Sequence, residues 1–336
     1  MMLTIEEIES ACASSQPVKL PKNGIEAPDL RFEETFHPYG FPAVVRSNSD
    51  SILEQFRELW GHFEKHHSTE PIRVDAQLVQ DESTECPPEP SYRAMMPLMM
   101  AVADSNNYSI VDLDRCYTNI VVSRAALRHR LYAQYFLLGT PGCCISTTHA
   151  TPIHAGCVAL DGRGVLLCGD SGAGKSTLSY ACARQGWTYI SDDGSYLLNS
   201  GTERMVTGDC YKFRFRPTTA ELFPEIEGLE ITPRAAGKPS IELQTDTMPY
   251  IARAQTAHVD FIVFLNRRAG NPQELVPYRQ DVARQFMRQA LWGSAMTRAA
   301  QYAALENLLK TEIFELRYTS IDWATHRLRA LVERGR

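Results

Sequence analysis

A glycine-rich motif at residues 169–176 is the feature that most constrains this chain. It fits the phosphate-loop pattern G-x-x-x-x-G-K-[ST] at every fixed position. The apolar run 164–168 before it predicts a buried strand, and the segment 177–183 after it predicts a helix. Strand, loop and helix in this order indicate an α/β nucleotide-binding core. The residues assigned to the nucleotide are Gly169, Asp170, Ser171, Gly172, Ala173, Gly174, Lys175, Ser176 and Thr177.

The residue types of this motif suit a polyphosphate. Successive backbone N–H groups form an anion-binding nest, and the helix N-terminus adds its dipole. Gly172 and Gly174 let the backbone approach the phosphates without a Cβ atom. Lys175 is expected to reach the β- and γ-phosphates, and the Ser176 hydroxyl is expected to bind Mg²⁺. The alternative is a glycine-rich turn that binds nothing, and the complete match to the pattern weighs against it.

Composition is that of an ordinary soluble globular protein. The chain has 336 residues, of which 44% are hydrophobic and 22% charged, enough for two domains or for one large domain with an appendage. The net charge of −6, without a long basic block, argues against a nucleic-acid-binding protein. No apolar stretch approaches the length of a membrane span, and the acidic N-terminus does not resemble a signal peptide. A cytoplasmic location is therefore expected.

The cysteines support the same expectation. There are nine of them, scattered and without a C-x-x-C pair, which indicates buried thiols in a reducing compartment. Cys143 and Cys144 precede His149 closely, so a metal site is an alternative. Core thiols beside a polar loop are favoured, because no second ligand pair has zinc-like spacing.

The hydrophobic pattern divides the chain into three parts. Residues 1–28 are expected to be a tail, 29–140 an α+β domain, and 141–336 an α/β catalytic domain. In the first domain the pattern predicts helices at 50–63 and 124–138, and strands at 36–47 (a pair), 72–79 and, two or three of them, within 93–122. In the second it predicts helices at 281–310 and 322–334 besides that after the loop, and strands at 145–147, 156–160, 164–168, 188–190, 196–198, 204–206, 240–243, 259–265 and 313–318.

Two carboxylates form the second candidate feature. Asp192 and Asp193 follow the predicted strand 188–190, whose end is expected to face the same phosphates as the loop. One carboxylate can hold or orient Mg²⁺ while the other accepts a proton from an attacking hydroxyl. An Asp-Asp-Gly turn without function is the alternative. His154, which precedes the strand pair that leads into the loop, can orient a carboxylate or shuttle a proton, or can be structural.

Together these residues resemble the catalytic domain of the bacterial HPr kinase/phosphorylase family, whose core is similar to that of the phosphoenolpyruvate carboxykinases. The matching parts are His154, the loop 169–176 and the pair Asp192-Asp193, and the resemblance covers residues 143–245. It implies a P-loop kinase core of this type behind the N-terminal α+β domain. It also implies ATP and Mg²⁺ as cofactors and a serine of a protein or peptide as the phosphate acceptor.

The resemblance further implies a role for each matching residue. Lys175 would contact the phosphates, and Ser176 would bind the Mg²⁺. Asp192 would be the general base. Asp193 would be a metal ligand or a carboxylate that contacts a metal ligand, and His154 would be the group that orients Asp192. The family tends to form rings, so a homo-oligomer is among the assemblies that the resemblance allows.

The chain departs from the family pattern after the loop. Thr177 stands where the family usually has Glu, and the segment 211–217 lacks the family's metal-linked Glu. Glu221 is a candidate substitute. Arg214 and Arg216 of this segment can grip a phosphate or an acidic acceptor, or can lie on a solvated strand face.

The N-terminal part also departs from the family. Residues 1–140 do not resemble the usual N-terminal domain, so HPr itself is not the expected acceptor. The chain is more similar to the divergent kinases of this group, some of which phosphorylate peptides of natural-product pathways. A small-molecule kinase on the same core and a non-catalytic ATP-binding regulator are the alternatives.

Overall fold

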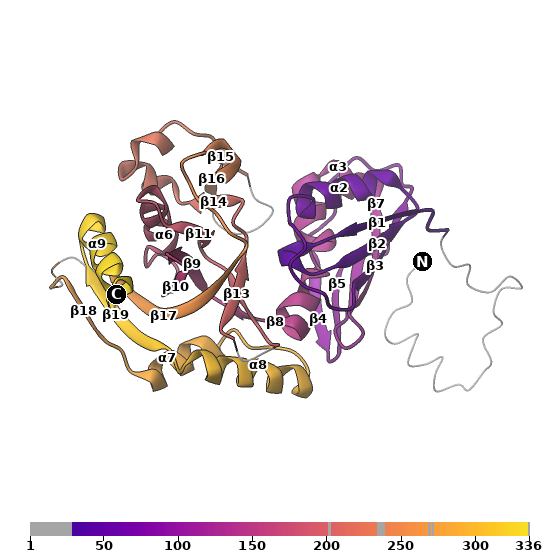
Figure 1. Cartoon of the computed structure of the whole chain (residues 1–336). Helices are drawn as coiled ribbons and strands as arrows, with labels where there is room; N and C mark the ends of the chain where they lie inside the picture. The colour runs from indigo at the N-terminus through magenta and orange to yellow at the C-terminus, as the bar shows by residue number, and fades with distance from the viewer. Residues whose placement is uncertain (1–28, 201–202, 234–238, 268–269, 271, 335–336) are drawn as a thin grey trace, which may run out of the picture.

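The computed structural model describes residues 29–200, 203–233, 239–267, 270 and 272–334. The predicted tail at 1–28 lies outside the described residues. Within them the chain is a mixed α/β protein with three sheets, one in the N-terminal half and two in the C-terminal half (Figure 1). No helix in the described ranges is long and apolar enough to cross a membrane.

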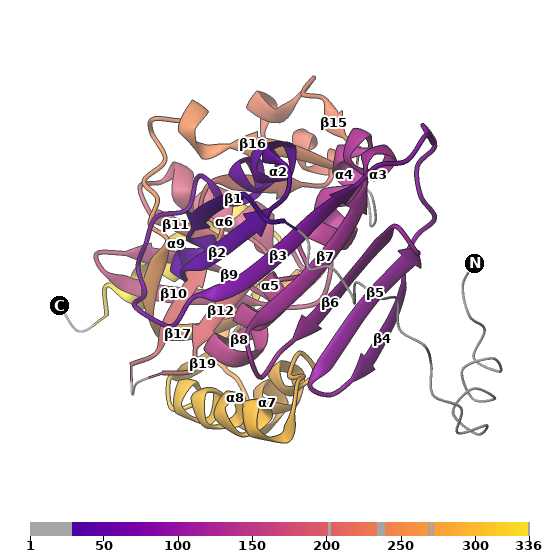
Figure 2. The same ribbon diagram turned by 90° about the vertical axis from the view of Figure 1, so that its right-hand side faces the viewer.

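The first sheet has seven strands in the order β1-β2-β3-β7-β6-β5-β4 (Figure 2). Strands β2, β3 and β7 run parallel, and the other neighbours are antiparallel. Four strands lie between residues 91 and 123, more than the two or three that the sequence predicted. The bounds are β1 (Phe32–Phe36), β2 (Ala43–Ser47), β3 (Ile72–Val79), β4 (Ser91–Met95), β5 (Leu98–Asp104), β6 (Asn107–Asp112) and β7 (Tyr117–Ser123).

Helix α2 (Asp50–Trp60) covers this sheet, and the short helix η1 (Pro38–Gly40) joins β1 to β2. Ile52, Leu53, Phe56 and Trp60 recur at helical spacing, so they form one apolar face. That face is buried in a core shared with the strands of the sheet. Burial of these four side chains, at roughly 1.5–3 kcal/mol each, is what holds α2 in place.

Short helical segments connect the two halves, and two predictions fail here. The helix predicted for 124–138 is divided into α3 (Arg124–Arg128), α4 (Arg130–Ala133) and η2 (Gln134–Leu138), because His129 has a non-helical ψ of 66°. The strand predicted at 145–147 is wrong, since α5 (Gly142–Cys144) continues into η3 (Ile145–His149). So short a segment does not distinguish strand from helix. The Thr147 hydroxyl donates back to the Cys143 carbonyl at 2.7 Å, as in a helical turn.

The second sheet has nine strands and is built around β17 (Thr256–Arg267). Both β10 and β19 pair with β17 in parallel, and β13 pairs antiparallel with its first residues. On the other side of β10, β9 and then β11 continue the sheet. The remaining bounds are β8 (Ala150–Ile153), β9 (Ala155–Leu160), β10 (Arg163–Cys168), β11 (Thr188–Ser191), β12 (Ser195–Leu198), β13 (Met205–Gly208), β18 (Glu274–Pro277) and β19 (Glu312–Tyr318).

Both faces of this sheet are covered by helices. In β10, Val165 and Leu167 enter the core beneath α6 (Lys175–Arg184) and α9 (Ile321–Val332). Leu166 and Cys168 enter the opposite core, beneath α7 (Gln280–Arg288) and α8 (Ala295–Leu308). Because β10 is buried on both faces, successive residues of the strand are apolar, which explains the continuous apolar run in the sequence.

The helical segment predicted at 281–310 consists of two helices, α7 and α8. Gly293 has a φ of +123°, which lies outside the helical region. Ser294 then caps α8, accepting a hydrogen bond from the Thr297 N–H at 3.3 Å.

A third, small sheet lies beside α6. It has the order β14-β16-β15, with β14 (Lys212–Phe215), β15 (Ile231–Thr232) and β16 (Ser240–Gln244). Phe213 and Phe215 pack edge-to-face on Tyr180 of α6. Side chains alternate along a strand, so Arg214 lies on the other face, toward the end of β11. The short helices η4 (Pro217–Glu221), η5 (Pro224–Ile226) and η6 (Thr245–Thr247) complete this part.

Candidate active site

The glycine-rich loop joins β10 to α6 with the predicted strand before it and the predicted helix after it. Gly172 and Gly174 have φ values of 93° and 100°, which favour glycine. Gly174 is the N-cap of α6, and no side chain caps this helix. The first N–H groups of a helix have no intrahelical acceptor and carry the positive end of its dipole. A Cβ atom at Gly172 would meet nothing within 4 Å, so the loop backbone is open to an anion.

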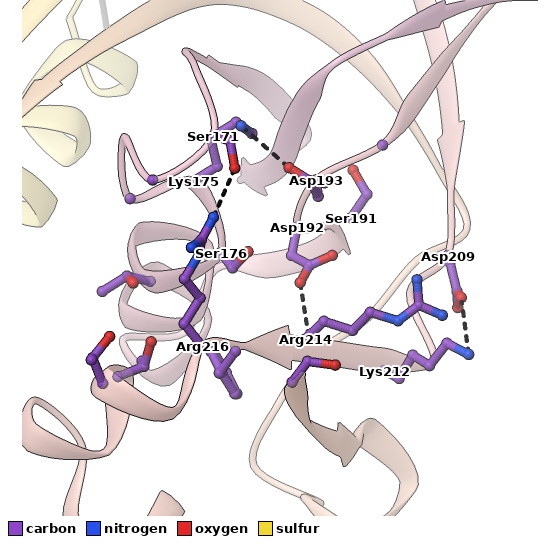
Figure 3. Close-up of a pocket in the computed structure, with 18 of the residues that line it drawn as sticks. Ser171, Lys175, Ser176, Ser191, Asp192, Asp193, Asp209, Lys212, Arg214 and Arg216 are labelled. Carbon is purple, nitrogen blue, oxygen red and sulfur yellow. Dashed lines mark hydrogen bonds and ion pairs between the residues drawn. The ribbon is translucent and has the colours of Figure 1, made fainter. Parts of the chain in front are cut away.

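A cavity of about 760 Å³ lies against this loop, within the range of small-molecule binding sites. The loop, the turn after β11, β14 and η4 form most of its wall (Figure 3). Six of the residues assigned to the nucleotide line it: Ser171, Gly172, Gly174, Lys175, Ser176 and Thr177. The other three, Gly169, Asp170 and Ala173, belong to the loop but do not line the cavity.

Lys175 places its ammonium group at the mouth of the loop. The side chain is buried, and its Nζ atom donates to the Gly169 carbonyl at 2.8 Å. Nζ also lies 3.2 Å from Asp193 Oδ1 and 2.8 Å from His154 Nε2 (Figure 3 draws the contact with Asp193). A buried cation is retained when polar groups surround it, and these partners hold Lys175 next to the cavity.

His154 lies between β8 and β9 and contacts Asp193, with Nε2 3.6 Å from Oδ1. Burial lowers the pKa of this imidazole, and the Lys175 charge lowers it further. The imidazole is therefore neutral at pH 7, and its Nε2 accepts from the Lys175 ammonium. The resemblance implied that His154 orients Asp192, whereas the contacts given by the structure are to Asp193 and Lys175.

Asp192 follows β11 and is held by the small sheet. Its Oδ2 accepts a hydrogen bond from the Arg214 backbone N–H at 2.8 Å (Figure 3). Burial raises the pKa of this carboxyl to about 6, against the opposing effect of the Arg214 N–H and charge. Its ionised form is thus costly, and it accepts a proton more readily than an exposed aspartate does.

Asp193 and Ser176 are the candidate ligands for a cation. The Asp193 side chain is 59% exposed, and both residues line the cavity. The described residues contain no group of three His, Cys, Asp or Glu side chains that could hold a metal ion. Mg²⁺ nevertheless fits, because it is usually bound by one or two carboxylates, with substrate phosphates and water as its other ligands. The donor set here has that composition.

Basic side chains form the opposite wall. Arg216 reaches across and donates from Nη2 to Ser171 Oγ at 2.8 Å (Figure 3). Arg214 donates from Nε to Glu242 Oε1 at 3.1 Å, so an acidic partner holds its guanidinium. The sequence had left open whether these arginines face a ligand or solvent, and both line the cavity, as does Glu221.

The sequence did not identify which residue of the N-terminal half contributes to the cavity. Tyr39 of η1 lines the cavity and lies against Tyr196 of β12, with ring centroids 4.6 Å apart. The nearby Tyr196 and burial raise the pKa of Tyr39, which keeps the phenol neutral. Pro38-Tyr39-Gly40 was readable as a turn, but nothing in it indicated contact with residues more than a hundred positions away.

Comparisons with known proteins do not show a family for this chain. No family model matches the sequence, and no curated protein matches it. Among solved structures, the Hpr(Ser) kinase/phosphatase from Coxiella burnetii is similar over 55% of this chain and 99% of its own, with 14% identity and a TM-score of 0.30. At this level of similarity the function must be argued from the cavity itself.

Proposed function

We propose that this protein is an ATP- and Mg²⁺-dependent phosphotransferase whose acceptor is a hydroxyl group, most consistently the serine of a protein or peptide. One observation carries the proposal. The Lys175 ammonium at the end of an open glycine loop lies 3.2 Å from Asp193, and the proton-accepting Asp192 lines the same cavity. A candidate phosphate ligand, a candidate cation ligand and a candidate base therefore lie at one place, which supports the proposal.

The chemistry follows from these positions. The N–H groups at the start of α6 and the Lys175 ammonium offset the charge of the β- and γ-phosphates. A bound Mg²⁺, held by Asp193 and Ser176, would supply further charge neutralisation at the phosphates. The oxygen of the acceptor hydroxyl attacks the γ-phosphorus while Asp192 takes the proton of that hydroxyl. ADP then leaves. A pKa near 6 suits a general base, because the carboxylate is ionised at neutral pH and still binds a proton more strongly than an ordinary aspartate does.

One observation favours a second candidate, an ATP-binding regulator without transfer activity. The family's metal-linked Glu has no counterpart in β14 or directly after it, where Arg214 and Arg216 occupy the cavity wall. With fewer carboxylates at the cation, the protein would bind nucleotide without activating it. Turnover distinguishes the two candidates.

The test combines nucleotide binding with turnover. Calorimetry should show Mg²⁺-dependent ATP binding that Lys175→Met weakens at least about tenfold, because the phosphates lose their principal cation. ADP formation, with and without a library of serine peptides and small alcohols, should fall about 100-fold or more in Asp192→Asn. Asp246→Asn is the matched control, since this carboxylate is exposed and does not line the cavity.

Each outcome has a clear meaning. Absence of ATP binding by the wild-type chain would overturn the proposal. Full turnover by Asp192→Asn would remove Asp192 from the role of base. Tight binding without ADP formation with any acceptor would favour the regulator, and transfer to small alcohols but not to peptides would favour a small-molecule kinase.

A further inference from the structure

An arginine at the edge of the cavity has no part in the reaction described so far. Arg267 is the last residue of β17, and it is exposed. It lines the same cavity as the glycine-rich loop. Within the described part of the chain, its guanidinium has no hydrogen bond and no ion pair. A cation in this position needs an explanation, because its donors are turned to no protein group.

The other basic side chains of the described cavity wall are already paired. Each has a carboxylate or hydroxyl oxygen of the protein within 4.0 Å. The pairs are Lys175–Asp193, Lys212–Asp209, Arg214–Glu242 and Arg216–Ser171. Arg267 therefore differs from them in keeping its donors free for a ligand.

The register of β17 carries Arg267 to the level of the loop. Cys168, the last residue of β10, pairs with Phe264 of β17. β17 continues for three more residues, which is about 10 Å at the usual rise of a strand. A Cβ atom at Gly169, in the loop, would lie 3.5 Å from the Leu265 carbonyl oxygen of this extension. The end of β17 thus runs beside the glycine-rich loop.

The Arg267 side chain passes the start of α6. A Cβ atom built on Gly174, the N-cap of this helix, would lie 3.9 Å from Arg267 Cδ. The guanidinium begins at the next atom of the side chain. It therefore lies near the positive end of the helix dipole, an arrangement that an anion between them would stabilise. The planar fork of a guanidinium matches the geometry of a phosphate.

The strand order decides which phosphate Arg267 meets. Strands β11, β10 and β17 end at the same edge of the sheet, in the spatial order β11-β9-β10-β17. The turn that carries Asp192 is thus on one side of the loop, and Arg267 is on the other. In the proposed reaction the γ-phosphate lies on the side of Asp192, where the acceptor hydroxyl is deprotonated. The α-phosphate, at the other end of the phosphate chain, is then the one nearest to Arg267.

We propose that Arg267 is a further nucleotide-binding residue, whose guanidinium donates to the α-phosphate. The inference rests on the proposed function, because the position of the base sets the direction of the nucleotide. The bonds that form and break are at the γ-phosphorus, so a contact to the α-phosphate is nearly the same in the substrate and in the transition state. Loss of this contact should therefore weaken nucleotide binding far more than it slows the chemical step.

The first test measures binding by calorimetry with the full-length protein. Arg267→Met should raise the dissociation constants of ATP and ADP by the same factor, roughly tenfold, because both lose a charge-assisted hydrogen bond. Arg267→Lys should lose less, since it keeps the charge. Arg298→Met is the matched control, because Arg298 is exposed on α8 and does not line the cavity. Wild-type affinities in Arg267→Met would overturn the proposal.

The second test identifies the phosphate. AMP, measured by displacement of a fluorescent ADP analogue, should also bind about tenfold more weakly to Arg267→Met. Tripolyphosphate, which has no nucleoside, should be weakened as well. A loss for ATP alone would put Arg267 at the γ-phosphate, and a loss that spares AMP would put it at the β-phosphate. Unchanged tripolyphosphate binding would put it at the nucleoside. Each of these three results contradicts the proposal.

Turnover separates this inference from the proposed function. In Arg267→Met the KM for ATP should rise about tenfold, and kcat should change far less. A fall in kcat with an unchanged KM would contradict the role given to Arg267 and leave the phosphotransferase proposal intact. ATP binding by the wild type without ADP formation would count against phosphotransfer alone, and the binding series would still decide the role of Arg267. Absence of ATP binding would overturn both.

Discussion

At the scale of single residues, the cavity holds a carboxyl group in an unfavourable environment. Asp192 is held by one backbone N–H, and burial raises its pKa from 3.8 to about 6. A group whose pKa is raised on folding binds its proton more tightly in the folded state than in the unfolded chain. The folded protein therefore loses stability as the pH rises through this range, a cost often found where a site needs a base.

Asp192→Asn is expected to stabilise the fold at pH 8 by about 2 kcal/mol, since one pKa unit corresponds to roughly 1.4 kcal/mol. The amide oxygen still accepts from the Arg214 N–H, while the buried charge is gone. The gain should shrink as the pH falls from about 6 toward 4, because the wild-type carboxyl then takes up a proton in the folded state and the unfavourable charge disappears. Urea unfolding at pH 8 and at pH 4.5 measures it.

Asp246→Asn provides the comparison, because it removes an exposed carboxylate of the same half. Its effect should be small and nearly independent of pH. Equal stabilities of wild type and Asp192→Asn at pH 8 would show that Asp192 is not destabilised in the folded protein.

At the scale of elements, two strands hold the turn after β11. Gly156 of β9 faces this turn, and a Cβ atom there would lie 2.9 Å from the Asp192 carbonyl oxygen and 2.7 Å from Ser179 Oγ. On the other side, a Cβ atom at Gly208 of β13 would lie 2.6 Å from Ser191 Cβ. The absence of side chains at both positions lets β9 and β13 approach the turn that carries Asp192 and Asp193.

Gly156→Ala is expected to displace Asp192 or α6 and to lower turnover about tenfold to 100-fold, because small errors in position are costly in catalysis. Overpacking should also reduce the stability by about 1–3 kcal/mol. ADP formation and urea unfolding measure the two effects. Gly142→Ala is the control, since a Cβ atom there meets nothing within 4 Å. Unchanged turnover in Gly156→Ala would mean that this contact does not position Asp192.

At the scale of the whole molecule, a buried glutamine joins the two halves. Gln255, just before β17, donates from Nε2 to the Glu64 carbonyl at 3.2 Å and accepts from the Glu64 N–H at 3.1 Å. The Thr207 hydroxyl of β13 donates to the Tyr39 carbonyl at 3.0 Å. These contacts hold the N-terminal half, with Tyr39, against the cavity of the other half.

Gln255→Ala is expected to lower the free energy of unfolding by about 1–3 kcal/mol, because both backbone groups of Glu64 lose a partner. Unfolding followed by tryptophan fluorescence measures the change. Gln289→Ala, at an exposed position, should have little effect. If both variants unfold at the wild-type urea concentration, the glutamine contacts do not stabilise the assembly of the two halves.

Much of the secondary structure was readable because its signals are local. The apolar run of β10, the glycines of the loop and the periodicity of α2 each lie within one short segment. The predictions failed in segments whose conformation is set by tertiary contacts. Ile145–His149 is helical, and His129 and Gly293 interrupt segments that were predicted to be helical. For such segments tertiary contacts outweigh local propensity.

The sequence by itself determined which residue types can bind phosphate and accept a proton, because a glycine loop and paired carboxylates carry that chemistry within a few positions. Only the tertiary structure decided their partners. It put His154 beside Asp193, gave Asp192 the Arg214 N–H, and brought Tyr39 to the wall of the cavity. These contacts join distant segments, and strand order and packing set such contacts, which no local pattern encodes.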